Sequence, residues 1–111
     1  MWNEIKTKLE ETGEEVFYGA GRFKDRESWD CIVCGKRRLK NEKMQKTQFW
    51  FVAIVREEFI QDGTEQIVIE KLRELGLKQT DADAEYAYVE KSGECMVEIC
   101  TMEFYKTVKG C

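Results

Sequence analysis

The stretch Phe49-Trp50-Phe51-Val52-Ala53-Ile54-Val55 decides the fold, because it carries the strongest strand pattern in the chain. Aromatic and β-branched residues fill it, and they predict a strand over residues 47–57. Alternate side chains of a strand point to opposite faces of its sheet. One face therefore receives Phe49, Phe51, Ala53 and Val55, and the other receives Trp50, Val52 and Ile54. Both faces are apolar, which is typical either of a central strand buried on both sides or of a strand in an assembly interface.

Two helices are predicted, one before and one after this strand. Residues 2–12 carry apolar side chains at helical spacing, namely Trp2, Ile5 and Leu9. The second helix begins at a capping box formed by Asp62 and Glu65, in which each side chain bonds the other's free backbone N–H. Its apolar face consists of Val68, Ile69, Leu72 and Leu75. Gly76 then adopts the left-handed conformation that ends a helix, and Leu77 folds back on the last turn.

Further strands are predicted from alternating apolar residues and turn signals. They cover residues 16–18, 29–33, 86–91 and 95–108, and Ser92-Gly93 forms a hairpin turn between the last two. The order of elements is therefore α-β(β)β-α-β-β, with short or basic links between strands. It predicts one α+β domain over residues 1–111, with a mainly antiparallel four- or five-stranded sheet and two helices packed on it.

Composition excludes several classes of function. The 111 residues have room for one domain and include no histidine, the commonest general base and metal ligand. Ser28 and Ser92 both lack the G-x-S-x-G setting of a serine nucleophile, so we expect no catalytic residue and no enzymatic activity. No apolar run approaches the roughly 20 residues of a membrane span, and the N-terminus does not resemble a secretion signal. We therefore expect a cytosolic protein without membrane contact.

The five cysteines indicate reduced thiols rather than a disulfide framework. Cys31-Ile32-Val33-Cys34-Gly35 has the C-x-x-C spacing of a zinc knuckle. Its partner pair would be Cys95 and Cys100, whose spacing is wider, and a strand through residues 29–34 sends Cys31 and Cys34 to opposite faces. No metal and no cofactor are therefore expected. A small zinc- or thiol-dependent adaptor that uses these four cysteines remains the alternative function.

Residues 36–46 concentrate positive charge, with six Lys or Arg against one Glu. This segment carries +5, which leaves −9 on the rest of a chain whose net charge is −4. It is predicted to be a hairpin, either a tip in solvent or an arm that docks on an acidic neighbour or near nucleic-acid phosphate. Aromatic residues for base stacking do not interleave with the charges, so no specific nucleic acid is expected. The candidate subunit or partner interface consists of Lys36, Arg37, Arg38, Lys40, Lys43, Trp50, Val52 and Ile54.

Segments spread over nearly the whole chain carry a family resemblance. They are Trp29–Val33, the basic hairpin, Phe51–Glu57, Glu70-Lys71-Leu72, Gly76-Leu77, residues 81–88 and Val97-Glu98-Ile99. In this order they resemble the tail terminator or tail-completion (neck) proteins of tailed bacteriophages, prophages and phage-tail-like particles. The likeness lies in the pattern of these segments and not in a catalytic motif.

The resemblance implies a virion structural protein at the tail–head junction, assembled in the cytoplasm of the host bacterium. Such proteins form a hexameric ring on the finished tail tube, stop its polymerisation and present a surface to the head connector. The implied partners are further copies of this chain, the tail tube protein and head–tail connector proteins. A ring requires two different, complementary surfaces on each subunit, and an acidic body with a basic arm offers them. Another head–tail connector or a minor capsid component would share the same sequence features.

Overall fold

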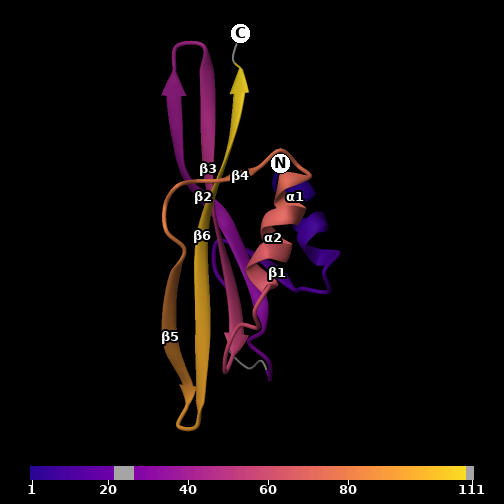
Figure 1. Cartoon of the computed structure of the whole chain (residues 1–111), viewed down its shortest axis with the longest axis vertical. Coiled ribbons are helices and arrows are strands. Elements are labelled where there is room, and N and C mark those ends of the chain that lie inside the picture. Colours follow the sequence, from indigo (N-terminus) through magenta and orange to yellow (C-terminus); the bar gives the residue numbers. More distant parts are fainter. Residues whose placement is uncertain (22–26, 110–111) are drawn as a thin grey trace.

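β3 (Gln45–Glu57) lies at the centre of the sheet in this computed structural model, which describes residues 1–21 and 27–109 (Figure 1). The other elements are α1 (Trp2–Glu10), β1 (Val16–Tyr18), β2 (Cys31–Glu42), α2 (Thr64–Arg73), β4 (Lys78–Gln79), β5 (Glu85–Ser92) and β6 (Cys95–Lys109). The strands follow the order β1-β2-β3-β6, and β4 and β5 both pair with the outer edge of β6. The chain is elongated along its strands, with a longest dimension of 53 Å.

The sheet confirms the α+β class and differs from the prediction in two details. Over the described residues it has six strands, because Lys78–Gln79 pairs briefly with Tyr105 and Phe104, and no sequence pattern marks so short a strand. It is also mixed, since β1 runs parallel to β2 while the other described pairings are antiparallel. Parallel neighbours need a long connection rather than a tight turn, and residues 19–30 supply one.

Both helices pack on one face of the sheet and bury the first apolar cluster (Figure 1). The helices contribute Ile5, Leu9, Val68 and Leu72 to it. Trp50, Val52 and Ile54 of β3 lie in the same cluster, with at most 2% of their surface exposed. Apolar side chains in this position stabilise the fold by leaving water. The three β3 residues of the candidate interface are therefore core residues, and their side chains do not reach a partner of the folded chain.

The opposite face of the sheet holds a second cluster. Its buried members are Cys31, Val33, Ala53, Val55 and Val97. Phe17, Trp29, Phe51 and Ile99 pack against them and are partly buried. Most of β3 therefore has core on both sides, and folding of the single chain accounts for the two apolar faces of residues 49–55 without an assembly interface.

The predicted start of the second helix is wrong, and its predicted end is confirmed. The N-cap residue is Gly63, at a φ of +93°, and no side chain caps the helix. Glu65 instead accepts a hydrogen bond from the Tyr86 hydroxyl at 2.6 Å, so a contact with β5 replaces the local capping box. At the other end, Gly76 has a φ of +82° and the backbone N–H of Leu77 donates to the carbonyl of Leu72 at 3.0 Å. This is the predicted left-handed termination.

The basic segment is a hairpin, as predicted, but nearly all of it is strand. β2 continues to Glu42 and β3 begins at Gln45, so only Lys43 and Met44 form the turn. The predicted end of this strand at residue 33 is therefore wrong. Lys and Arg are poor strand formers by propensity, and pairing with β3, which itself pairs with β6, overrides that preference.

Candidate assembly surface: a basic ribbon and an acidic edge

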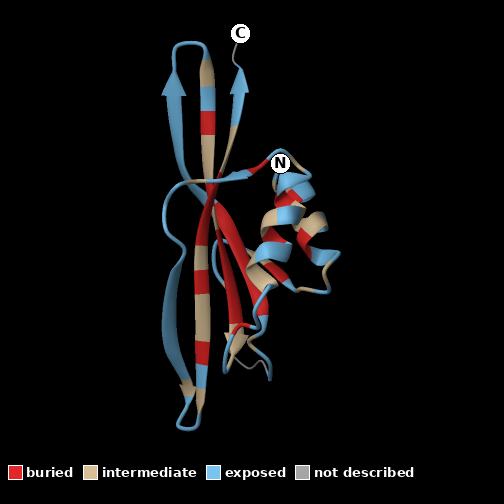
Figure 2. Cartoon of the chain, in the orientation of Figure 1, coloured by how far each residue is buried: buried red, intermediate tan, exposed pale blue. Residues whose placement is uncertain are grey.

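β2, β3 and β6 continue beyond the core as a three-stranded extension of residues 36–49 and 105–109, called the basic ribbon below (Figure 2). Residues 36–44 and 107–109 are all exposed. The ribbon holds eight Lys or Arg and one Glu, so it carries +7 and leaves −11 on the rest of the chain, for a net charge of −4. Strands gain little stability without an apolar face to bury. The length of the ribbon is thus not explained by the stability of one chain.

A β-bulge shapes the base of the ribbon. The register of β2 against β3 shifts between Lys36 and Arg38, which makes Arg37 the extra residue. Both arginines reach the carboxylate of Glu103, whose side chain is only 7% exposed, with Nη1–Oε2 distances of 3.1 Å for Arg38 and 3.6 Å for Arg37. A carboxylate this buried needs such partners, because an unpaired buried charge is costly. Two residues of the candidate interface therefore anchor the ribbon to the sheet.

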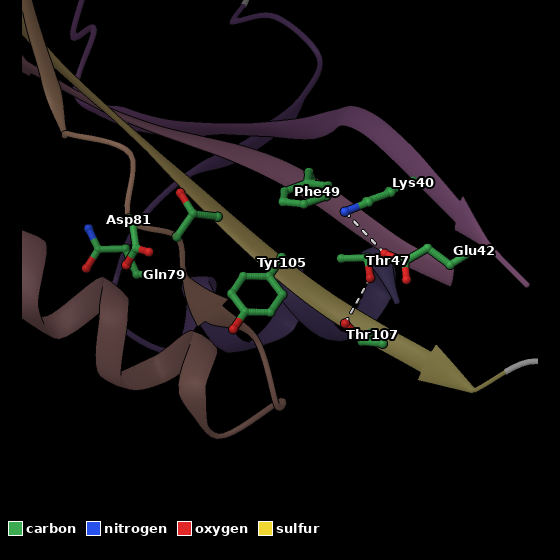
Figure 3. A pocket seen from close by; sticks show the side chains of 9 residues that line it. Lys40, Glu42, Thr47, Phe49, Gln79, Asp81, Tyr105 and Thr107 are labelled. Atoms are coloured by element: carbon green, nitrogen blue, oxygen red, sulfur yellow. Dashed lines mark hydrogen bonds and ion pairs between the residues drawn. The ribbon is translucent and has the colours of Figure 1, made fainter. Parts of the chain in front are cut away.

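The face of the ribbon away from the helices contains a hollow of about 290 Å³ (Figure 3). It is lined by Lys40, Glu42, Thr47, Phe49, Gln79, Thr80, Asp81, Tyr105 and Thr107. The guanidinium of Arg38 lies 3.8 Å from the centre of the Phe49 ring, in a cation–π contact. The hydroxyls of Thr47 and Thr107 are hydrogen-bonded to each other at 2.9 Å. Aromatic residues and arginine are enriched in protein–protein interfaces, and Phe49, Tyr105 and Arg38 supply both types here.

Three of the predicted basic residues project from the ribbon, Lys36 and Lys40 from its outer strand and Lys43 from the turn. All three are exposed, and Lys40 pairs with the neighbouring Glu42 at 3.2 Å. The sequence did not identify Phe49 and Tyr105 as ribbon surface, although their rings lie 6.1 Å apart. Only the register of β3 against β6 brings these two residues together, and that register is not visible from either segment alone.

The sheet edge formed by β5 is exposed (Figure 2) and is the acidic counterpart of the ribbon. Among the residues that the structure describes, β5 pairs with β6 alone, and residues 85–90 are all exposed. The acidic residues on and beside it are Asp81, Asp83, Glu85, Glu90 and Glu94. Large side chains are also exposed here, including Tyr88 at 60%. This second surface is therefore negative, partly apolar and open along one side of a strand.

The described cysteines are divided between the two faces of the sheet. Cys34 and Cys100 lie in the cluster beneath the helices, and Cys31 lies in the cluster on the other side. Cys95 lies at the end of β6, where its Sγ is 3.6 Å from Oε1 of Glu57. In residues 1–21 and 27–109, no three His, Cys, Asp or Glu side chains are grouped to hold a metal ion. Cys111 is outside the described residues.

Three of the described thiols, those of Cys34, Cys95 and Cys100, favour the neutral form. Burial raises the pKa of the Cys34 thiol to about 12. Desolvation likewise raises the pKa of Cys95 and of Cys100. Nucleophilic attack requires the thiolate, so the raised pKa values oppose a thiol-dependent reaction. The separation of the cysteines across the sheet opposes a shared zinc site.

No family model matches this sequence, and no curated protein sequence matches it. In the described part of the chain, neither helix has the length and apolar character that crossing a membrane requires. The two charged surfaces are therefore the features from which a function can be argued.

Proposed function

We propose that this chain is a non-enzymatic virion structural protein that caps the end of a phage tail tube as a ring, stops tail polymerisation and helps to join the tail to the head. Its partners in this proposal are further copies of itself, the tail tube protein and head–tail connector proteins, and the expected ring is a hexamer. The subunits assemble in the cytoplasm of the host bacterium and stay at the tail–head junction of the virion. The proposal involves no metal, cofactor, membrane or specific nucleic acid.

The basic ribbon is the observation that carries the proposal. It extends from the core with residues 36–44 and 107–109 exposed, and it carries a charge of +7 while the rest of the chain carries −11. A subunit with a positive arm and a negative body attracts a second copy head to tail, and rotation closes such contacts into a ring. The family resemblance of the sequence adds the kind of assembly, a ring at the end of a tail tube.

The chemistry of the described side chains favours this role over catalysis. The hollow on the ribbon contains Thr47 and Thr107, whose hydroxyls bond each other, and no general base lies among its lining residues except the exposed carboxylates of Glu42 and Asp81. The thiols that could act as nucleophiles have raised pKa values. A nucleophile needs an adjacent base or a lowered pKa to react at neutral pH. Contact with other proteins remains the use for which these surfaces are suited.

Deletion of the gene in its own host tests the proposal. Lysates of the deletion strain, examined by negative-stain electron microscopy, are expected to contain tailless heads and unjoined tubes of irregular length. A plasmid copy of the natural chain is expected to restore joined particles. Joined particles with tails of normal length in the deletion strain would overturn the proposal.

The contribution of the ribbon is tested by complementing the same strain with K36E/K40E/K43E. These lysines are chosen because Arg37 and Arg38 hold Glu103, and their reversal would disturb the fold. The variant is expected to fold and to fail in tail joining. The matched control K6E/K71E/R73E changes the net charge equally on the two helices and is expected to complement.

A further inference from the structure

Two edges of the sheet are open in the described chain. β1 pairs with β2 only at Ile32–Cys34, so residues 36–42 of β2 form one open edge, called the basic edge. Residues 85–90 of β5 form the other, called the acidic edge, because β5 pairs on one side with β6. Proteins commonly block exposed edges with proline, with bulges or with inward-pointing charges. The chain contains no proline, and the bulge at Arg37 lies at the start of the basic edge, so residues 38–42 and residues 85–90 are regular strand with a free side.

The two edges are complementary in charge and in length. The basic edge has Lys36, Arg37, Arg38 and Lys40 against Glu42, for a net charge of +3. Residues 81–90, which lead into and include the acidic edge, have Asp81, Asp83, Glu85 and Glu90 and no cation, for a net charge of −4. Each edge extends over six or seven residues. Pairing of two basic edges or of two acidic edges would place like charges opposite each other, which is destabilising.

We infer that the basic edge of one copy pairs with the acidic edge of the next, so that the sheet continues from subunit to subunit. The inference rests on the proposed function and names the contact that closes the ring. The occupant of each edge is a second copy of this chain, because the chain itself supplies the opposite charge at the opposite edge. Strand addition provides main-chain hydrogen bonds, and the charges fix which edges meet. The contact is heterologous, the type that generates rings.

The faces of the sheet agree with this pairing. Lys36 pairs with Trp50, which lies on the helix face, while Lys40 pairs with Thr47, which lines the hollow on the other face. On β5, alternation places Glu90 on the helix face, opposite Met96, and Glu85 on the other face, opposite Thr101.

β2 and β5 also run in opposite directions within the sheet. Two copies that face the same way therefore bring their edges together as antiparallel strands. Lys36 then lies toward Glu90 on one face, and Lys40 lies toward Glu85 on the other. Diagonal neighbours on adjacent strands are within reach of long side chains, so both ion pairs form in one register.

Reciprocal charge reversal tests the contact. The variant K36E/K40E changes the net charge of the basic edge from +3 to −1, and E85K/E90K changes that of residues 85–90 from −2 to +2. Native mass spectrometry over a concentration series is expected to show closed oligomers for the natural chain and about 100-fold weaker self-association for each variant alone. An equimolar mixture of the two variants is expected to restore oligomers in which the variants alternate. Circular dichroism verifies that each variant is folded.

The outcomes distinguish pairing of these two edges from a general effect of net charge and from the proposed function. The control K6E/R73E has the same net charge as K36E/K40E and is expected to self-associate like the natural chain and not to rescue E85K/E90K. A natural chain that stays monomeric, a single variant that assembles normally, or a mixture that fails to assemble would overturn the edge pairing. If K36E/K40E nevertheless complements the deletion strain, the edge pairing fails and the tail-capping function stands. Normal tails in the deletion strain itself remove the function instead.

Discussion

Arg38 donates a hydrogen bond from Nη1 to Oε2 of Glu103 at 3.1 Å, and this bond joins the first part of the basic ribbon to β6. The two residues are 65 positions apart in the chain. Glu103 is nearly buried, whereas the Arg38 side chain is 56% exposed. The cation that binds the buried carboxylate therefore still faces solvent on the ribbon. The same residue stabilises the monomer and contributes charge to the surface that we assign to assembly.

Replacing Glu103 with Gln is expected to destabilise the fold by about 1–2 kcal/mol. The loss is smaller than the roughly 3–5 kcal/mol of a fully buried ion pair, because both arginines are half exposed. Urea unfolding of E103Q, R38M and the double variant measures the coupling, which is expected to be about 0.5–1 kcal/mol. Strictly additive single effects would contradict a direct interaction.

The ion pair between Glu57 and Lys91 is expected to make stability depend on pH in the acid range. The hydrogen bond from Lys91 lowers the pKa of Glu57 below its ordinary value of 4.5. A carboxylate whose pKa is lower in the folded chain stabilises it above the unfolded pKa, and this contribution disappears as the pH falls through the folded value. The free energy of unfolding of the natural chain minus that of E57Q should therefore shrink between pH 6 and pH 3, as measured by urea titration.

The Lys91→Met background provides the control for this pH dependence. In K91M chains the main cause of the lowered pKa is absent, so adding E57Q should produce a difference in unfolding free energy that changes much less with pH. An equal change with pH in both backgrounds would mean that another group is responsible.

Gly76→Ala is expected to cost about 1–2 kcal/mol, because the φ of +82° at the end of α2 is unfavourable for a residue with a Cβ. The added methyl group meets no clash, since its nearest neighbours are Lys106 side-chain atoms at 3.5 Å. Gly93→Ala in the β5–β6 turn is the matched control. Its φ is not positive and nothing lies within 4 Å, so a change within about 0.5 kcal/mol is expected. Thermal or urea unfolding of both variants decides the point, and equal effects would contradict the account.

Thiol labelling is expected to distinguish Cys95 from the other described cysteines. Cys31, Cys34 and Cys100 are completely buried, whereas Cys95 is partly exposed. In a C111S background, Ellman's reagent should therefore modify Cys95 alone in the native protein, and the other three only as the chain unfolds. Added zinc should not change this pattern. Fast reaction of a second thiol, or protection of Cys95 by zinc, would revive the adaptor alternative.

The sequence predicted the elements more reliably than their environment. The alternation of apolar residues and the turn residues marked β3, the hairpin of β5 and β6, and the end of α2 at Gly76, because these signals are local. The alternation did not show whether Trp50, Val52 and Ile54 lie in the core or in an interface. Their burial depends on where α1 and α2 pack, and that is a property of the whole fold.

The charge of the site was predictable from the sequence, whereas its bulge and its open strand edge were not. Lys36, Lys40 and Lys43 could be identified as a basic surface from the concentration of positive charge in residues 36–46. The bulge at Arg37 could not, because it exists only as a mismatch between two strands. The acidic edge was also missed as a surface: the sequence predicted a strand over residues 86–91, and only the sheet order shows that this strand is an open edge.

The central claim is that this chain caps tail tubes, and it is tested most directly on the tubes themselves. Tubes purified from the deletion strain are incubated with tagged natural chain, labelled with gold and imaged by electron microscopy before and after addition of tube protein. We predict label at one end of each tube and no further elongation of the labelled tubes. Label distributed along the tubes, or elongation that continues past a labelled end, would contradict the claim.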